Sequence, residues 1–469
     1  MTDASKLLLA ASAARTATPI HAVDADSLKA ITGKLSAIQQ TWVKQNGFKA
    51  ASGKWLAVPD DKGGLAMVLY GQPGPDADPL EAASLATSLP TGTYALSAGF
   101  DNPELIALGW LLACYRFNRY LPARANGSKP ADMARLACPD GVDRDRTIAI
   151  AGAVCMGRDM INTPAEDMGP SQLEAAAREL AKTHKAKVAV TRGVSLQKNF
   201  PMIHAVGRAS DDAPRLIDMT WGRASAPKVT LVGKGVCFDT GGLDLKPSSG
   251  MALMKKDMGG AAAVLSLARM VMAAGLDVRL RVLVPAVENA VSGNSFRPGD
   301  ILTSRKGLTV EIGNTDAEGR LVLGDALHLA DSEKPDLLID MATLTGAARV
   351  ALGPDLPPFY TDDSALAADI EAHGNAVADP VWRMPFWTRY NEMFSSKVAD
   401  INNAGTGGFA GSITAALFLK RFVENTKAYV HFDIYGWVPS ARPARPLGGE
   451  PQAARALFSL LSSRYPARK

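Results

Sequence analysis

The chain has 469 residues, which is too many for one ordinary hydrophobic core, so two domains are expected. Hydrophobic residues make up 47% and charged residues 21%, as in ordinary globular enzymes, and the formal net charge of +4 does not by itself indicate binding to nucleic acid or to a membrane. No apolar run approaches the roughly 20 residues of a membrane span. The four cysteines lie far apart without a C-x-x-C pair, which argues against disulfides and a thiolate zinc site; we therefore expect reduced thiols and a cytoplasmic protein.

The first 140 residues mix apolar, strand-like runs such as Leu65–Tyr70 with Gly, Pro and Asp turns. Residues 105–120 predict a helix with a buried face. Residues 6–14 faintly imitate a signal peptide, but their apolar stretch is short, so we expect the first strand or helix of the fold there. This part shows no catalytic constellation. The polar stretch 124–145, which contains two prolines, is the expected domain boundary.

From residue 146 onward, predicted strands and helices alternate. The strands are expected at 188–190, 216–221, 229–232, 278–287, 308–312 and 337–341, and the helices at 146–161, 169–182, 260–274, 321–331 and 412–422. Such alternation predicts an α/β fold with a mostly parallel central sheet flanked by helices. Ligand sites in such sheets form at the carboxyl ends of the strands.

The most informative stretch, residues 314–321, reads NTDAEGRL and lies between a predicted strand and a predicted helix. Asp316, Glu318 and Arg320 alternate there, and in an extended segment residues two apart project to the same side. Crowded charges repel or require costly desolvation unless something binds them. A multivalent cation is the obvious candidate, although a solvated acidic turn would account for Asp316 alone.

Upstream, more charged residues follow the predicted strand 229–232 at glycine-rich breaks, where the backbone turns tightly and approaches a bound group closely. These residues are Lys234, Asp239, Lys246 and Asp257. With the two carboxylates of the 314–321 segment, they supply four hard oxygen donors. Such donors suit Zn, Mn or Mg in a two-metal cluster.

At these residues the sequence resembles the leucyl aminopeptidase family, the dinuclear metallo-aminopeptidases of the M17 type. The resemblance covers roughly residues 150–465. Its segments are VGKG-x-x-FD, LKP, DMGGAA, FRPGD (296–300), NTDAEGRL and DMATLTGAA (340–348). It implies a catalytic M17 domain over 146–469 and a smaller N-terminal α/β domain over 1–140. That smaller domain diverges from the family, and a macro-like fold is one form considered for it.

The resemblance implies a ligand set for each of two divalent ions, with Zn or Mn favoured and Mg or Co as alternatives. Asp239, Asp316 (side chain and main-chain carbonyl) and Glu318 would hold the more exchangeable ion. Lys234, Asp239, Asp257 and Glu318 would hold the tighter one, so Asp239 and Glu318 would bridge. A lysine ligand must be neutral, and both burial and a dication favour that form.

The same resemblance assigns the remaining roles. Lys246 would stabilise the oxyanion of a tetrahedral intermediate, and Arg320 would anchor a bicarbonate that acts as general base. The free amino group of a peptide would bind the tighter ion and Asp257. Met254, Thr343 and Gly346 would line the pocket for a leucine-like or methionine-like first side chain, although sequence alone favours ordinary core filling for Met254.

Rival motifs fit poorly. No H-E-x-x-H pair and no G-x-S-x-G elbow occur, and VGKG at 232–235 lacks the Ser/Thr of a P-loop. The glycine-rich run 405–411 could cap an anion or simply begin a helix. Tyr435 stands where the family usually has a small residue, and the segment 438–450 also departs from it, which leaves the exact substrate preference open.

The leading hypothesis is a cytosolic aminopeptidase that acts on peptides with a two-metal-activated water. By resemblance it would be a homo-hexamer, with no membrane partner and no nucleic-acid partner expected. One alternative is a dipeptidase of the same family, for example acting on Cys-Gly. Another is a DNA-binding or scaffold role on the same fold, for which Arg442 and Arg445 are the only sequence support.

Overall fold

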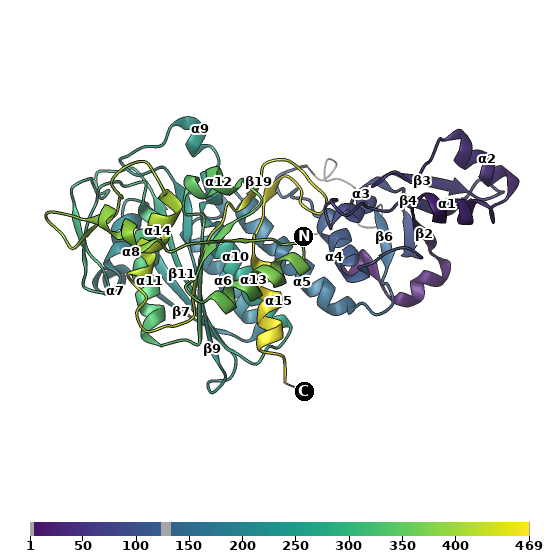
Figure 1. Cartoon of the computed structure of the whole chain (residues 1–469). Helices are drawn as coiled ribbons and strands as arrows, with labels where there is room; N and C mark the ends of the chain where they lie inside the picture. The colour runs from purple at the N-terminus through teal and green to yellow at the C-terminus, as the bar shows by residue number, and fades with distance from the viewer. Residues whose placement is uncertain (1–3, 123–132, 469) are drawn as a thin grey trace. The chain divides into compact units, whose positions relative to one another are not determined.

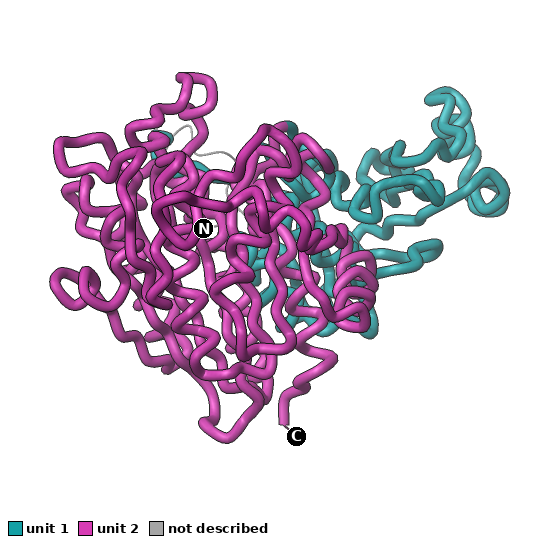
Figure 2. Tube along the Cα trace, turned by 60° about the vertical axis from the view of Figure 1, so that its left-hand side comes forward, with its two compact units in different colours: residues 1–155, 440–447 teal, residues 156–439, 448–469 magenta. Residues whose placement is uncertain are grey.

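The computed structural model describes residues 4–122 and 133–468, so residues 124–132 of the expected boundary lie outside the described part. The chain forms two compact units (Figure 2). Unit 1 comprises Met1–Cys155 and Ser440–Leu447, and unit 2 comprises Met156–Pro439 and Gly448–Lys469. Among the described residues, no helix is long and apolar enough to cross a bilayer.

Unit 1 contains a six-stranded sheet of order β1-β6-β5-β2-β4-β3. Its strands are β1 (Leu8–Leu9), β2 (Thr18–Val23), β3 (Trp55–Pro59), β4 (Leu65–Gly71), β5 (Gly92–Leu96) and β6 (Ala134–Ala137). All neighbours pair in parallel except β3 with β4. The expected first element is therefore present, because β1 pairs with β6 instead of standing apart from the fold.

The main helices of unit 1 are α1 (Ala25–Thr32), α2 (Ala37–Gln45) and α4 (Pro103–Ala113). Helix α4 is shorter than the predicted span 105–120. It ends where the Arg116 guanidinium donates to the carbonyls of Ala113 (2.8 Å) and Tyr115 (2.7 Å), satisfying groups that a longer helix would have bonded internally.

Unit 2 is built on a nine-stranded sheet of order β16-β15-β18-β14-β9-β11-β8-β7, with β10 also paired to β11. The strands are β7 (Lys187–Arg192), β8 (Arg215–Trp221), β9 (Lys228–Gly233), β10 (Gly235–Asp239), β11 (Arg279–Asn289), β14 (Leu337–Ala342), β15 (Pro358–Tyr360), β16 (Trp382–Met384) and β18 (Tyr429–Asp433). The central strands β18, β14, β9 and β11 run parallel to one another. Strand β8 pairs antiparallel with β11, and β7 pairs antiparallel with β8. The predicted α/β class with a mostly parallel sheet is confirmed.

Helices cover both faces of this sheet (Figure 1). On one side pack α6 (Pro170–His184), α10 (Gly259–Ala273), α13 (Ser364–Ala376) and α15 (Ala454–Arg464); on the other pack α8 (Pro201–Gly207), α11 (Glu318–Ser332) and α14 (Gly411–Lys420). Further helices are α5 (Arg144–Asn162), α7 (Gly193–Asn199), α9 (Ser248–Met251) and α12 (Gly346–Leu352). Both faces of the central strands are therefore buried, which explains their near-continuous apolar sequences.

The predicted strand 308–312 exists in shorter form, but in a separate small sheet. It is β13 (Thr309–Glu311), which pairs with β12 (Ile301–Thr303) and β17 (Ile401–Asn402). Only its central residue, Val310, is fully buried. A strand that buries one of three side chains suits a half-exposed sheet, whereas the central sheet takes strands buried on both faces.

Candidate active site

A cavity of about 570 Å³ in unit 2 brings the predicted site residues together. Its walls come from the loops after β9 and β14, the end of β10, the 3-10 turn Met254–Met258 and the start of α11. All ten predicted site residues line it: Lys234, Asp239, Lys246, Met254, Asp257, Asp316, Glu318, Arg320, Thr343 and Gly346. Segments more than 100 positions apart in sequence therefore meet at one place.

Lys234 follows β9 and is buried in the cavity wall. Its Nζ donates to the Thr343 carbonyl (3.0 Å) and lies 2.6 Å from Asp257 Oδ2 and 2.9 Å from Glu318 Oε1. Burial alone would lower the pKa of Lys234, but Asp257, Glu318 and Asp239 together raise it above its usual range. Lys234 is thus the positive centre of a group of buried carboxylates.

Asp239 is the last residue of β10, and hydrogen bonds hold one oxygen of its carboxylate in place. Its Oδ1 accepts hydrogen bonds from the Asn289 amide (2.8 Å) and from the backbone N–H of Gly241 (2.8 Å). Its Oδ2 lies 2.8 Å from Lys246 Nζ. Gly241 has φ +87°, and a Cβ there would lie 3.0 Å from Asp316 Oδ1, so the turn needs glycine. The loop therefore aims one oxygen of Asp239 into the cavity.

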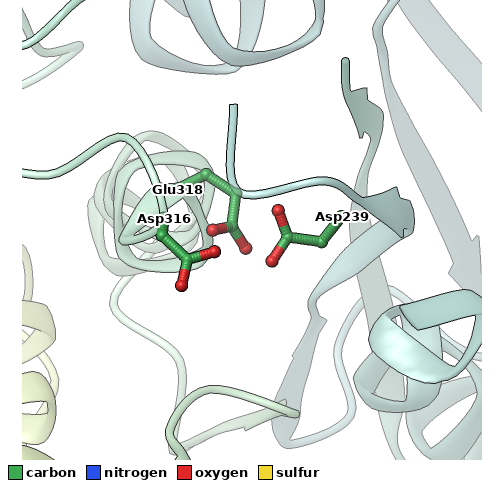
Figure 3. Close-up of side chains that lie close together, drawn as sticks. All are labelled: Asp239, Asp316 and Glu318. Atoms are coloured by element: carbon green, nitrogen blue, oxygen red, sulfur yellow. The ribbon is translucent and has the colours of Figure 1, made fainter. Parts of the chain in front are cut away.

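Asp316 lies in the loop that leads into α11, and Glu318 is the first residue of that helix. Their carboxyl groups point toward Asp239 (Figure 3). Oxygen atoms of the three side chains lie within 4.8 Å of one another. Thr315 ties this loop to the first one, because its hydroxyl donates to the Gly241 carbonyl (2.6 Å). The two loops are therefore held together at the point where the carboxylates meet.

The electrostatics of this cluster favour a bound cation. Burial, together with the nearby Asp239, raises the pKa of Glu318 to about 8. Burial also raises the pKa of Asp316 and of Asp257, with Asp239 adding to the effect. The buried oxygens Asp257 Oδ2, Asp316 Oδ1 and Glu318 Oε1 accept no hydrogen bond of regular geometry from the described residues and lie against lysine ammonium groups instead. Crowded hard oxygen donors with few partners fit divalent cations.

Asp257 is held beside the predicted substrate pocket. Thr343 Oγ1 donates to Asp257 Oδ1 (2.8 Å) and to the Asp257 carbonyl (2.9 Å). Met254 begins the same 3-10 turn, and Gly346 begins α12 on the neighbouring wall. The three predicted pocket residues are thus adjacent to a predicted metal ligand.

The two predicted catalytic cations make different contacts. Lys246 Nζ pairs with Asp239 and Asp316. Arg320, on the first turn of α11, donates to the Asn403 carbonyl (2.7 Å), while its Nε makes no hydrogen bond to a described residue. Burial lowers the pKa of Arg320 to about 10, so the guanidinium remains charged at neutral pH.

Three residues that sequence reasoning missed hold the site in place. Asn289 bonds Asp239, and Asn403 accepts from the backbone N–H of Gly313 (2.8 Å). Asp433 accepts from the N–H groups of Leu344 and Thr345 (3.1 Å each) and so fixes the loop after β14. Asp433 stands two residues before Tyr435, which the sequence analysis singled out; the two asparagines carry no motif.

Tyr435, noted from sequence as a departure, lies on the cavity wall with Lys256 and Arg349. Its ring centroid is 5.0 Å from Lys256 Nζ and 5.1 Å from Arg349 Cζ. Burial lowers the pKa of Lys256 to about 8, and the positive charges of Lys234 and Arg349 act in the same direction, against Asp257. Neither cation was singled out from the sequence.

Comparison with known families identifies the family of the chain. The model of the cytosol aminopeptidase family catalytic domain matches residues 155–458, and that of the M17 aminopeptidase N-terminal domain matches residues 18–139. The chain belongs to the M17 cytosol aminopeptidase family. It is therefore a metallo-exopeptidase, a hydrolase that removes N-terminal residues. The N-terminal match covers the part in which sequence motifs gave little resemblance.

Individual relatives of this M17 protein are named as members of the same family. A probable cytosol aminopeptidase of Rhizobium rhizogenes is 40% identical over 369 residues, which cover 76% of this chain and 73% of the relative. One from Chlorobium luteolum is 35% identical and covers 88% of this chain and 90% of the relative.

Solved structures show the same fold. The cytosol aminopeptidase of Coxiella burnetii superposes with a TM-score of 0.91 at 45% identity, covering 96% of this chain and 97% of that one. The bottromycin maturation enzyme BotP in complex with Mn superposes with a TM-score of 0.84 at 31% identity. The match covers 95% of this chain and 99% of that one.

Proposed function

We propose that this M17 enzyme binds two divalent cations and uses them to hydrolyse the first peptide bond of its substrates. Asp239, Asp316 and Glu318 would hold the exchangeable ion; Lys234 and Asp257, together with the bridging Asp239 and Glu318, would hold the tighter one. The observation that carries the proposal is the set of carboxylate oxygens within 4.8 Å of one another beside a second buried Lys–Asp pair. Zn or Mn are the proposed metals, with Mg or Co as alternatives.

When bound, such ions polarise the peptide carbonyl and lower the pKa of a bound water. Lys234 must lose its proton to act as a ligand; burial and a neighbouring dication both favour that form. Asn289 and Gly241 keep Asp239 oriented, because they occupy its other oxygen. The protein thus supplies a rigid set of donors.

The two remaining cations act on the substrate. Lys246 would stabilise negative charge that develops on the carbonyl oxygen, the contribution that is usually largest in such sites. Arg320 would hold a small anion such as bicarbonate, which would accept the proton of the attacking water. Its Nε, which makes no hydrogen bond to a described residue, and its charged state support this role.

The first residue of the peptide would lie between Asp257 and the wall formed by Met254, Thr343 and Gly346. The Asp257 carboxylate would bind the free amino group, so that a peptide with an acylated N-terminus would not be cleaved. The apolar or small wall suits a leucine or methionine side chain. BotP, a relative solved in complex with Mn, supports manganese as one candidate metal.

Further properties are proposed on the same basis. The relatives are named cytosol aminopeptidases, which supports a cytosolic location. A homo-hexamer is proposed from the family resemblance. The domain ranges 1–140 and 146–469 are proposed as the N-terminal and catalytic domains. A dipeptidase preference remains an alternative that a panel of dipeptides and longer peptides would test.

The metal proposal is tested with Asp316→Ala and Glu318→Ala, assayed on Leu-p-nitroanilide with metal content measured by ICP-MS. Each variant is expected to lower kcat/KM more than about 100-fold and to bind less metal. Loss of a residue that only supports a metal ligand typically costs at most about 100-fold. Asp26→Ala is the control, because that carboxylate is 94% exposed. Parent-like activity in folded Asp316→Ala and Glu318→Ala would overturn the proposal.

A further inference from the structure

The wall of the cavity near Tyr435 carries positive charge that the proposed metal chemistry does not use. Lys256 is only 6% exposed and lines the cavity. It forms no ion pair and donates no side-chain hydrogen bond to any described residue. Its Nζ makes a cation–π contact with the Tyr435 ring, 5.0 Å from the ring centroid. A buried ammonium group without a carboxylate partner is costly, so this position favours an anionic ligand.

Arg349 adds a second cation to the same wall. Its Cζ lies 5.1 Å from the centroid of the Tyr435 ring, so Lys256 and Arg349 lie beside one aromatic side chain. The guanidinium also reaches toward Gly346, where a Cβ would lie 3.9 Å from Arg349 Nη2. Two like charges repel each other, and an anion between them would relieve that repulsion.

The nearby carboxylates are already engaged elsewhere. Asp257 pairs with Lys234 and accepts from Thr343. Asp433 accepts from the Thr345 hydroxyl (2.6 Å) and from two backbone N–H groups. Neither forms an ion pair with Lys256 or Arg349 within the described residues. The positive charge of this wall is therefore available to a ligand.

This wall belongs to the pocket proposed for the first side chain. Lys256 is next to Asp257, the proposed partner of the substrate amino group. Gly436, which follows Tyr435, packs on Thr343, because a Cβ at Gly436 would lie 3.0 Å from Thr343 Cγ2. A side chain that enters past Thr343 and Gly346 would thus meet Tyr435 and its two cations.

We propose that this aminopeptidase accepts peptides with an acidic N-terminal residue, glutamate or aspartate, whose side-chain carboxylate binds Lys256 and Arg349. This inference rests on the proposed function and names a substrate class for the same cavity. The Tyr435 ring lines the cavity and contacts both cations through cation–π interactions. The two cations at this end of the pocket would favour a side chain that ends in a carboxylate.

The test compares Glu-p-nitroanilide with its neutral isostere Gln-p-nitroanilide on the metal-loaded enzyme. The parent is expected to hydrolyse the Glu compound with a kcat/KM at least about tenfold higher, because a charge-assisted contact is absent with Gln. Lys256→Met is expected to lower the Glu/Gln ratio at least tenfold, and Lys256→Arg to retain most of it. Arg349→Met, at an exposed position, is expected to lower the ratio too.

Lys255→Gln is the matched control. Lys255 is the neighbouring lysine, but its Nζ donates to the Asn162 carbonyl (2.7 Å) and it does not line the cavity. Its removal deletes the same charge and is expected to leave the Glu/Gln ratio unchanged. Should Lys256→Met fail to fold, Arg349→Met measures the same ratio without disturbing a buried residue.

Several results would overturn the inference. A parent enzyme that cleaves Leu and Gln compounds but shows no advantage for Glu would contradict the acidic preference and leave the proposed function intact. A ratio unchanged in both Lys256→Met and Arg349→Met would do the same. If these variants instead weakened only the cleavage of free dipeptides relative to their C-terminal amides, the cations would bind the substrate's terminal carboxylate. Failure to cleave any of these compounds would overturn both proposals.

Discussion

Lys246 allows metal binding and catalysis to be separated at a single side chain. Burial would lower the pKa of Lys246, but Asp239 and Asp316 raise it overall, so the side chain is charged at neutral pH. Lys246→Met is expected to lower kcat by about 10²–10³-fold, as for other lost oxyanion donors. Metal content, measured by ICP-MS, is expected to stay at the parent level, since no proposed metal ligand is lost. Metal loss in proportion to activity would instead assign Lys246 to metal retention.

Residues with distinctive chemistry could be predicted from the sequence, whereas those that orient them could not. Asp316, Glu318 and Asp239 stand in glycine-rich breaks where a charged side chain needs a special explanation. Asn289 and Asn403 act by hydrogen bonds across the fold to segments far away in the chain. Sequence periodicity is local, so it does not reveal which polar side chain reaches a distant loop. Lys256 and Arg349 escaped notice for the same reason.

Helix α10 sits unusually close to strand β14, and Gly260 makes that approach possible. A Cβ at Gly260 would lie 2.0 Å from the Met341 carbonyl oxygen, which belongs to the strand backbone and cannot rotate away. Gly260→Ala is therefore expected to lower the free energy of unfolding by about 1–3 kcal/mol or more, measured by urea denaturation. The added methyl group would push α10 away from β14 and so move the turn that carries Asp257. The kcat/KM is therefore expected to fall.

The control for this change is Gly293→Ala. A Cβ at Gly293 meets nothing within 4 Å, and its φ is not in the left-handed region. Its unfolding free energy is expected to stay within about 0.5 kcal/mol of the parent. Equal effects at Gly260 and Gly293 would show that the close helix–strand contact does not require glycine.

Elements of the catalytic unit were predicted well because their apolar periodicity is long and regular. The helix at 260–274 is observed as Gly259–Ala273, and the strand at 337–341 as Leu337–Ala342. Two predictions were wrong in extent or placement. The helix at 105–120 ends at Ala113 because Arg116 caps it, and the strand at 308–312 joins a small sheet. Neither a cap nor a pairing partner can be read from periodicity alone.

A buried network on strands β14 and β18 predicts a pH dependence of stability. His431 Nδ1 lies 2.7 Å from Asp340 Oδ1, and the Tyr429 hydroxyl donates to Asp340 Oδ2 (2.7 Å). Burial would lower the pKa of His431, but Asp340 raises it overall. A raised folded pKa gives stability that is complete below the unfolded value of about 6.5 and is lost as pH rises through the folded pKa.

This sign can be checked with Asp340→Asn, which removes the charge that raises the pKa of His431. The unfolding free energies of the parent and of Asp340→Asn would be measured in urea from pH 6 to pH 9. The stability advantage of the parent is expected to shrink as pH rises across this range. A constant difference between the two would mean that His431 is neutral in the folded protein throughout.

At the scale of the whole molecule, the chain does not divide at a single point. The predicted ranges place 438–450 entirely with the catalytic part, whereas compact unit 1 includes Ser440–Leu447. Within unit 1, Arg445 lies 3.4 Å from Asp78 Oδ2, so a long-range ion pair holds this segment. The sequence support for DNA binding includes Arg445, and its ion pair with Asp78 weakens that alternative. A segment that returns to an earlier domain leaves no signal in local composition.

The proposed hexamer predicts the mass of the protein in solution. Several large apolar side chains of unit 2 are exposed in the single chain, among them Phe409 (86%), Val350 (83%) and Val398 (65%). A hexamer that covers these side chains would remove their apolar surface from water. Light scattering after size exclusion is therefore expected to give about six times the chain mass of 49.4 kDa. Phe409→Asp is expected to shift the distribution toward smaller species, because it places a charge in a surface that the partner subunits would cover. A fully active protein of one chain mass would contradict the assembly while leaving the metal site untouched.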